Sequence, residues 1–124
     1  MLSLATSALA LSAQSISAPA GSYVGSKTVL GQKISASINI DDASHADIGI
    51  NGAISISCAS EDYKYDGAST ITLPGEDTAG DCVHDALAEN KATIKSIKYD
   101  ASGDTITVTA HYLINVAITL SKKS

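Results

Sequence analysis

Apolar and polar residues alternate with a period of two along most of this chain. From Ile34 to Ile40, the even positions carry Ile or Ala and the odd positions carry Ser or Asn. The same pattern returns between Ile48 and Ile56 and between Ile106 and Leu120. Successive side chains of a β-strand point to opposite faces, whereas an amphipathic helix places its apolar residues three or four apart. The alternation therefore predicts half-buried strands in an antiparallel sheet.

The boundaries of the alternating runs predict seven strands. We expect them near residues 22–29, 33–40, 47–57, 62–65, 69–73, 93–99 and 104–120. The last run is too long for an ordinary strand, so a bend or tight reversal is expected near Tyr112 to Ile114, with a single long curved strand as the alternative. Turn residues separate the runs at Gly31, at 41–46, at Asp66-Gly67 and at 101–103. Asp66-Gly67 suits a two-residue type I′ turn.

A short helix is expected near residues 81–90. Asp81 is a good N-cap, Val83 and Leu87 belong to a narrow apolar stripe, and Asn90 is a plausible left-handed stop. The predicted fold is mainly β, an antiparallel up-and-down meander of about seven or eight strands that forms a small barrel or a curled sheet, with this one helix. An α+β fold, with a curled antiparallel sheet packed on the helix, is the alternative.

Composition fits one small domain of 124 residues with a net charge of −5. No apolar run reaches the roughly 18 residues of a membrane span. All eight positive charges are lysines, and no basic stripe is present, so nucleic acid is not an expected partner.

The N-terminal segment resembles a secretory signal peptide. Residues 1–26 carry no charged side chain, and Leu2 to Ala13 form an apolar stretch of suitable length. We expect residues 1–20 to be a signal peptide with an uncertain cleavage site, residues 21–124 to form the β-rich domain, and the protein to be secreted. The alternative is an Ala-rich helix or strand retained in the fold.

Cys58 and Cys82 are predicted to form a disulfide, because an even pair behind a signal-like segment is typical of an oxidising compartment. In the chain-entropy model, closing this loop stabilises the fold by roughly 3–3.5 kcal/mol. A pair of buried, reduced thiols is the alternative.

We expect no catalytic residue, no metal and no cofactor. The acidic cluster Asp41, Asp42, His45 and Asp47 lacks the alternation of a calcium loop. No nucleophile elbow or zinc-protease motif occurs, so an enzyme is not expected. The candidate ligand-binding residues are instead Tyr63, Tyr65 and Tyr112. Tyr63 and Tyr65 share one face of a strand, where they form a stacking platform or cover a sheet edge.

The segment Gly21-Ser22-Tyr23-Val24-Gly25 is similar to the opening of the lipocalin and avidin group of secreted β-barrels. The similarity covers five residues and departs at Tyr23, where that group has Trp. It is an analogy of architecture, and no ligand chemistry is carried over.

An inward face of Ile, Val, Leu and Ala with few large aromatics leaves room for a small apolar ligand. We therefore expect a secreted, non-enzymatic binding protein for a small apolar ligand or an extracellular protein surface. The alternative is a structural or adhesive extracellular module that forms homo-oligomers through an edge of the terminal strand, with Lys122 and Lys123 as edge guards.

Overall fold

The computed structural model describes residues 18–123. The predicted signal peptide, residues 1–20, lies outside these residues except for its last three. The elements are β2 (Gly21–Val29), β3 (Gln32–Ile40), β4 (His45–Gly52), β5 (Ile56–Asp62), β6 (Lys64–Tyr65), β7 (Thr70–Thr72), the 3-10 helix η1 (Pro74–Asp77), α2 (Cys82–Glu89), β8 (Thr93–Asp100), β9 (Thr105–Tyr112) and β10 (Ile114–Lys122).

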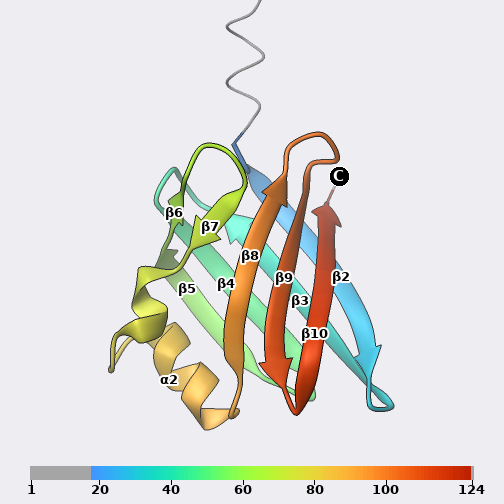
Figure 1. Ribbon diagram of the computed structural model, residues 1–124. Coiled ribbons are helices and arrows are strands. Elements are labelled where there is room, and N and C mark those ends of the chain that lie inside the picture. The colour runs from blue at the N-terminus through green and yellow to red at the C-terminus, as the bar shows by residue number, and fades with distance from the viewer. Residues whose placement is uncertain (1–17, 124) are drawn as a thin grey trace, which may run out of the picture.

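The strands form one antiparallel sheet of nine strands in the order β5-β4-β3-β2-β10-β9-β8-β7-β6. Neighbours in sequence are neighbours in the sheet except for β5 and β6, which form its two edges, and β2 meets β10 to join its two halves. The sheet curls until it is nearly closed into a barrel (Figure 1). The predicted mainly β meander with one helix is confirmed.

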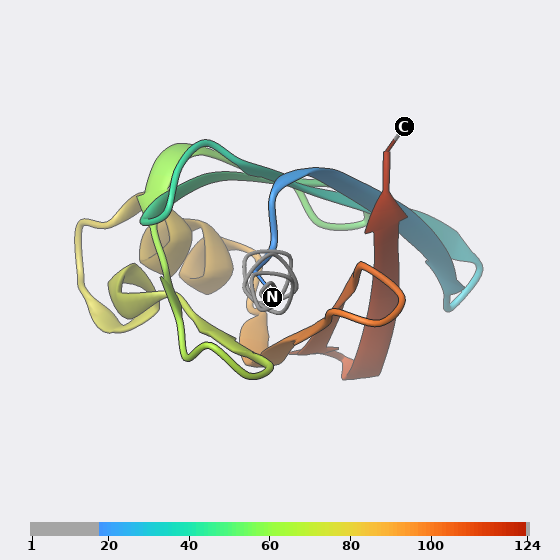
Figure 2. The same cartoon turned by 90° about the horizontal axis from the view of Figure 1, so that it is seen from above.

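Seen from above, β2 to β5 form one wall, β8 to β10 form the opposite wall, and α2 fills the side between them (Figure 2). Inward-facing aliphatic side chains from both walls make a single core. The largest fully buried side chains are Tyr23, Ile106, Leu120 and Val83. Even-numbered positions face inward on β3 and β10, as the alternation predicts.

The ladder between β2 and β10 is short. It contains the pairs Ser121↔Val24 and Lys122↔Tyr23, extended by a hydrogen bond of 2.7 Å from the Lys123 N–H to the Ser22 carbonyl. Beyond these pairs the two strands diverge, and the Lys27 ammonium donates to the Ala117 carbonyl across the gap at 3.3 Å. The barrel is therefore closed at one end and open at the other.

The barrel thus has a closed end and an open end. The closed end carries the loops 41–44 and 101–104 and the cluster of Tyr23, Tyr99 and Asp104. The open end carries the turn 30–31, the bend 53–55, the connection 90–92 and the reversal at Leu113, and it points downward in Figure 1. The two ends follow from the meander, because every second turn lies at the same end of the strands.

The predicted strand 47–57 is wrong. β4 ends at Gly52, where φ is +114°, and β5 begins at Ile56. The two strands pair with Ile50 opposite Ile56, so even positions stay opposite even positions through the reversal. The apolar alternation therefore continues across the bend and hides it.

The reversal expected near Tyr112 to Ile114 is confirmed, and the single long strand is not formed. Tyr112 pairs with Ile114, and Leu113 between them has φ +65°. Again even positions face even positions, from Ile106↔Leu120 onward. The type I′ turn predicted at Asp66-Gly67 is replaced by a wider loop, because the Asp66 carboxylate accepts the backbone N–H groups of Ala68, Ser69 and Thr70.

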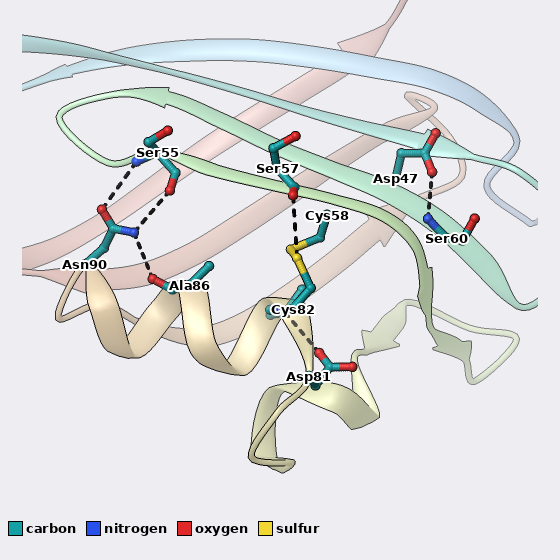
Figure 3. Close-up of a disulfide and its surroundings, with 10 residues drawn as sticks. Asp47, Ser55, Ser57, Cys58, Ser60, Asp81, Cys82, Ala86 and Asn90 are labelled. Atoms are coloured by element: carbon teal, nitrogen blue, oxygen red, sulfur yellow. Dashed lines mark hydrogen bonds between the residues drawn. A yellow bond between two sulfur atoms is a disulfide. The ribbon is translucent and has the colours of Figure 1, made fainter.

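Helix α2 is anchored at its start to β5 and at its end to the bend 53–55 that precedes β5 (Figure 3). Its N-cap is Asp81, as predicted, and accepts the Val83 N–H at 3.0 Å. The predicted Cys58–Cys82 disulfide is present beside this cap. At the other end, the Asn90 side chain bonds the backbone of Ser55 and the carbonyl of Ala86. Asn90 stays in the right-handed region, with φ −89°, and the left-handed residue is Lys91, so the predicted stop is displaced by one residue.

Gly25 makes the joint between β2 and β10 possible. A Cβ at this position meets the Thr119 carbonyl oxygen at 2.3 Å. We therefore expect Gly25→Ala to lower the free energy of unfolding by about 2–3 kcal/mol, the cost of overpacking a rigid contact. At Gly103 the nearest atom to a Cβ lies at 3.6 Å, so Gly103→Ala is the control and should change stability little. Urea denaturation measures both variants, and equal stabilities would contradict the role given to this contact.

Candidate functional site

The closed end is a hydrogen-bonded aromatic cluster. The Tyr23 and Tyr99 hydroxyls donate to the same oxygen of Asp104, at 2.7 and 2.9 Å. Lys122 bonds the other Asp104 oxygen at 3.2 Å and lies 5.3 Å from the centre of the Tyr23 ring. These donors lower the pKa of Asp104, the Tyr23 hydroxyl bond first among them. Burial raises the pKa of Tyr23. These contacts hold this end of the barrel together.

Two of the three tyrosines singled out in the sequence belong to this end of the molecule. Tyr63 is 5% exposed, and its hydroxyl donates to the Asp42 carbonyl at 2.9 Å. Tyr65 is half-buried and packs edge-on against Tyr99, with ring centres 5.8 Å apart. The binding role of Tyr63 and Tyr65 stays a prediction, but their rings face protein neighbours.

The third tyrosine, Tyr112, lies at an apolar cavity between the two walls. The cavity has a volume of about 50 Å³. Aliphatic side chains from both walls form its surface, among them Ile34, Ile38, Ile48, Ile97, Val116 and Ile118. Pockets for drug-sized ligands measure roughly 300–1,000 Å³. The cavity therefore admits only a few atoms of a hydrocarbon group.

The cavity opens toward the open end. Inward-facing apolar residues at the mouth are only half-buried, although equivalent residues deeper in the barrel are buried: Ile50, Ile94, Val108, Ala110 and Tyr112. They come from the end of β4, the start of β8 and the second half of β9. The chain has no Phe or Trp to fill this space. The mouth is thus an unfilled apolar opening with one phenol, Tyr112, at its rim.

The histidines lie on separate elements. His45 contacts Asp42 at 3.0 Å and Asp62 at 3.2 Å, and His84 contacts Asp85 at 3.0 Å. Hydrogen bonds from the Ser44 backbone and the His45 ring lower the pKa of Asp42. Within residues 18–123, no group of three or more His, Cys, Asp or Glu side chains is arranged to hold a metal ion. The acidic cluster is thus a set of hydrogen-bonded side chains on the loop 41–44 and at the start of β4.

Glu61 is a buried carboxyl group between β5 and the start of α2. It is 4% exposed, and its Oε2 has no hydrogen-bond partner among the described residues. Burial raises the pKa of Glu61 to about 7, with further contributions from a hydrogen bond to Asp81 and from the charges of Asp81 and Asp62. Near neutral pH this group takes up and releases a proton inside the fold.

The pKa of Glu61 makes stability depend on pH. Because its folded pKa of about 7 lies above the ordinary value of 4.5, folding takes up a proton between these values. The stability that protonated Glu61 contributes is complete below pH 4.5 and is lost as the pH rises from 4.5 through 7. We expect the free energy of unfolding to fall by about 2 kcal/mol between pH 5.5 and pH 8.

Denaturation of Glu61→Gln over the same range tests this dependence, which should largely disappear. The raised pKa of His45 acts in the same direction and leaves a smaller slope in the variant. Glu89→Gln, at an exposed position of α2, is the control and should keep the full slope. An unchanged slope in Glu61→Gln would show that another group is responsible.

Sequence reasoning missed Glu61 and Asp104. A register shift between Ala46 and Ile48, with Ser60 at φ +53°, inserts an extra residue into β5. The inward positions of this strand therefore change from Ile56 and Cys58 to Glu61. No local signal marks the bulge. Asp104 follows Gly103 in a turn, so its sequence context indicates a solvated loop residue. Its tyrosine partners come from β2 and β8, which are distant in sequence or in a separate strand, and no local pattern marks them.

Comparisons with known proteins find no matching family model, no similar curated protein and no similar solved structure. Among the described residues, no helix is long and apolar enough to cross a membrane.

Proposed function

We propose that this protein is a non-enzymatic binding protein whose open end accepts a small apolar group. The observation that carries the proposal is the half-buried aliphatic mouth of the cavity at Ile50, Ile94, Val108 and Ala110. Apolar side chains that face the interior of a domain are normally covered, whereas here the barrel leaves them partly exposed to solvent. Covering them with a ligand removes this surface from water at about 25 cal/mol per Å².

The size of the cavity limits the ligand. About 50 Å³ is several times smaller than the roughly 300–1,000 Å³ of a pocket that encloses a drug-sized ligand. A ligand therefore inserts a short hydrocarbon group and keeps the rest of its structure at the mouth, beside Tyr112. The phenol of Tyr112 supplies a polar contact at this rim. A secreted, extracellular location is part of the proposal, and the Cys58–Cys82 disulfide supports it.

Methyl NMR with 1-hexanol as the probe tests the pocket. We expect saturable shifts of the Ile50, Ile94 and Val108 methyl groups. Ala110→Leu fills the mouth and should weaken binding at least tenfold without loss of stability, because the added methylenes occupy empty apolar space. Ala117→Leu, on the exposed face of β10, is the matched control and should bind normally. If hexanol shifts no inward methyl group, or if both variants weaken binding equally, the pocket is not a binding site.

A second function, self-association, is favoured by the short joint between β2 and β10. Within the described chain, β10 has a ladder partner on its β2 side only at Ser121 and Lys122. The edge from Ile114 to Ile118 is guarded by the Lys27 ammonium at the Ala117 carbonyl. Such an edge offers backbone groups to another strand. A structural or adhesive module would assemble when a second copy of the chain adds a strand at this edge.

Proline at the edge tests self-association. The Ala117 carbonyl points toward β2, and the N–H of the same residue points to the same side of an antiparallel strand. Ala117→Pro therefore removes an edge donor without breaking the ladder to β9. If the protein associates through this edge, sedimentation velocity should show oligomers at high concentration for the wild type and a monomer for Ala117→Pro. A monomeric wild type would exclude this function.

A further inference from the structure

We propose that the open end docks on the surface of a bilayer that contains anionic lipids. Three exposed aliphatic side chains lie on the turns of this end: Leu30 at 63%, Leu113 at 69% and Ile114 at 46% exposure. Two turns that carry them, β2–β3 and β9–β10, project from the same end of the barrel (Figure 1). Aliphatic side chains on protruding turns are suited to enter the interface of a bilayer.

Both exposed leucines occupy positions that local structure disfavours. Leu30 has φ +52° in the two-residue turn between Val29 and Gln32, where Gly31 also has positive φ. Leu113 has φ +65° at the β9–β10 reversal. In the β2–β3 turn, Leu30 and Gly31 both have positive φ, and this type I′ conformation favours Asn-Gly. Backbone preference and exposure both disfavour leucine at these two positions, and a contact outside the chain would offset that cost.

The charges are divided between the two ends. The strand ends and turns around the open end, residues 27–33, 50–56, 89–95 and 111–116, carry four lysines, Lys27, Lys33, Lys91 and Lys95, and the carboxylate of Glu89. Glu76 and Asp77 of η1 lie beside them, since they line a groove with residues 92–94. The formal charge of this end is therefore 4 − 3 = +1, and because the whole chain has a charge of −5, the remainder carries −6. The open end is thus the more cationic part of a chain whose net charge is negative.

The four lysines are exposed, as are the turn leucines. Exposed cations around protruding apolar turns match a layer of anionic headgroups above acyl chains. An anionic protein would need a groove for each protruding turn, whereas a fluid bilayer accommodates them without a fixed shape. This docking needs no ligand in the cavity, so its failure would leave the proposed function of the pocket unaffected.

The test is co-sedimentation of the full chain with vesicles of equal parts phosphatidylglycerol and phosphatidylcholine. We expect binding at low salt that weakens with added salt, and little binding to phosphatidylcholine alone. Lys91→Gln with Lys95→Gln should lower the partition coefficient about 25-fold, because each lysine near an anionic surface contributes about a factor of five. Lys64→Gln with Lys123→Gln removes the same charge elsewhere and should have a much smaller effect.

The leucines allow a second variant that does not endanger the fold. Asn tolerates positive φ better than leucine, so Leu30→Asn with Leu113→Asn should be at least as stable as the wild type. We expect it to bind vesicles at least tenfold more weakly.

Three outcomes would overturn the proposal. The first is no binding to the anionic vesicles at low salt, and the second is equal binding to neutral vesicles. The third is a dimer in sedimentation velocity that the Leu30→Asn/Leu113→Asn variant loses, because the apolar turns would then be covered by a second copy of the chain.

Discussion

The structure depends on the meeting of its two terminal strands. β2 and β10 share two residue pairs, and Asp104, from the β8–β9 turn, gathers the Tyr23 and Tyr99 hydroxyls and the Lys122 ammonium at this joint. A carboxylate with several donors remains charged, which agrees with the lowered pKa of Asp104. One side chain thus connects three separate parts of the meander, and a curled sheet becomes a nearly closed barrel.

Closure at one end has a consequence at the other. Because β2 and β10 diverge beyond Gly25, the interior is covered poorly where the walls separate. A chain without Phe or Trp lacks the large side chains that fill such a space. Val108 and Ala110 therefore remain half-buried. The same opening carries the exposed turn leucines and half of the lysines, so the features relevant to binding lie together at the open end.

Much of the fold was predictable because its signals are local. Period-two alternation identified most strands and their inward faces, Asp81 marked the start of α2, and the cysteine pair indicated the disulfide. The bend at 53–55 was not predictable. Its pairing places even positions opposite even positions, so the alternation is the same for a straight strand and for a hairpin. The bulge at Ser60, by contrast, shifts the alternation of β5 by one residue and places Glu61 on the buried face.

The candidate site was predictable only in part. Tyr112 was identified and lies at the cavity mouth, whereas Tyr63 and Tyr65 pack against protein neighbours. The sequence by itself determined which side chains face inward, because that depends on the pleat of each strand. Only the tertiary structure decided where the barrel closes, which carboxyl groups meet, and that the lysines gather at one end. Those outcomes depend on contacts between distant strands, which no local pattern of residues encodes.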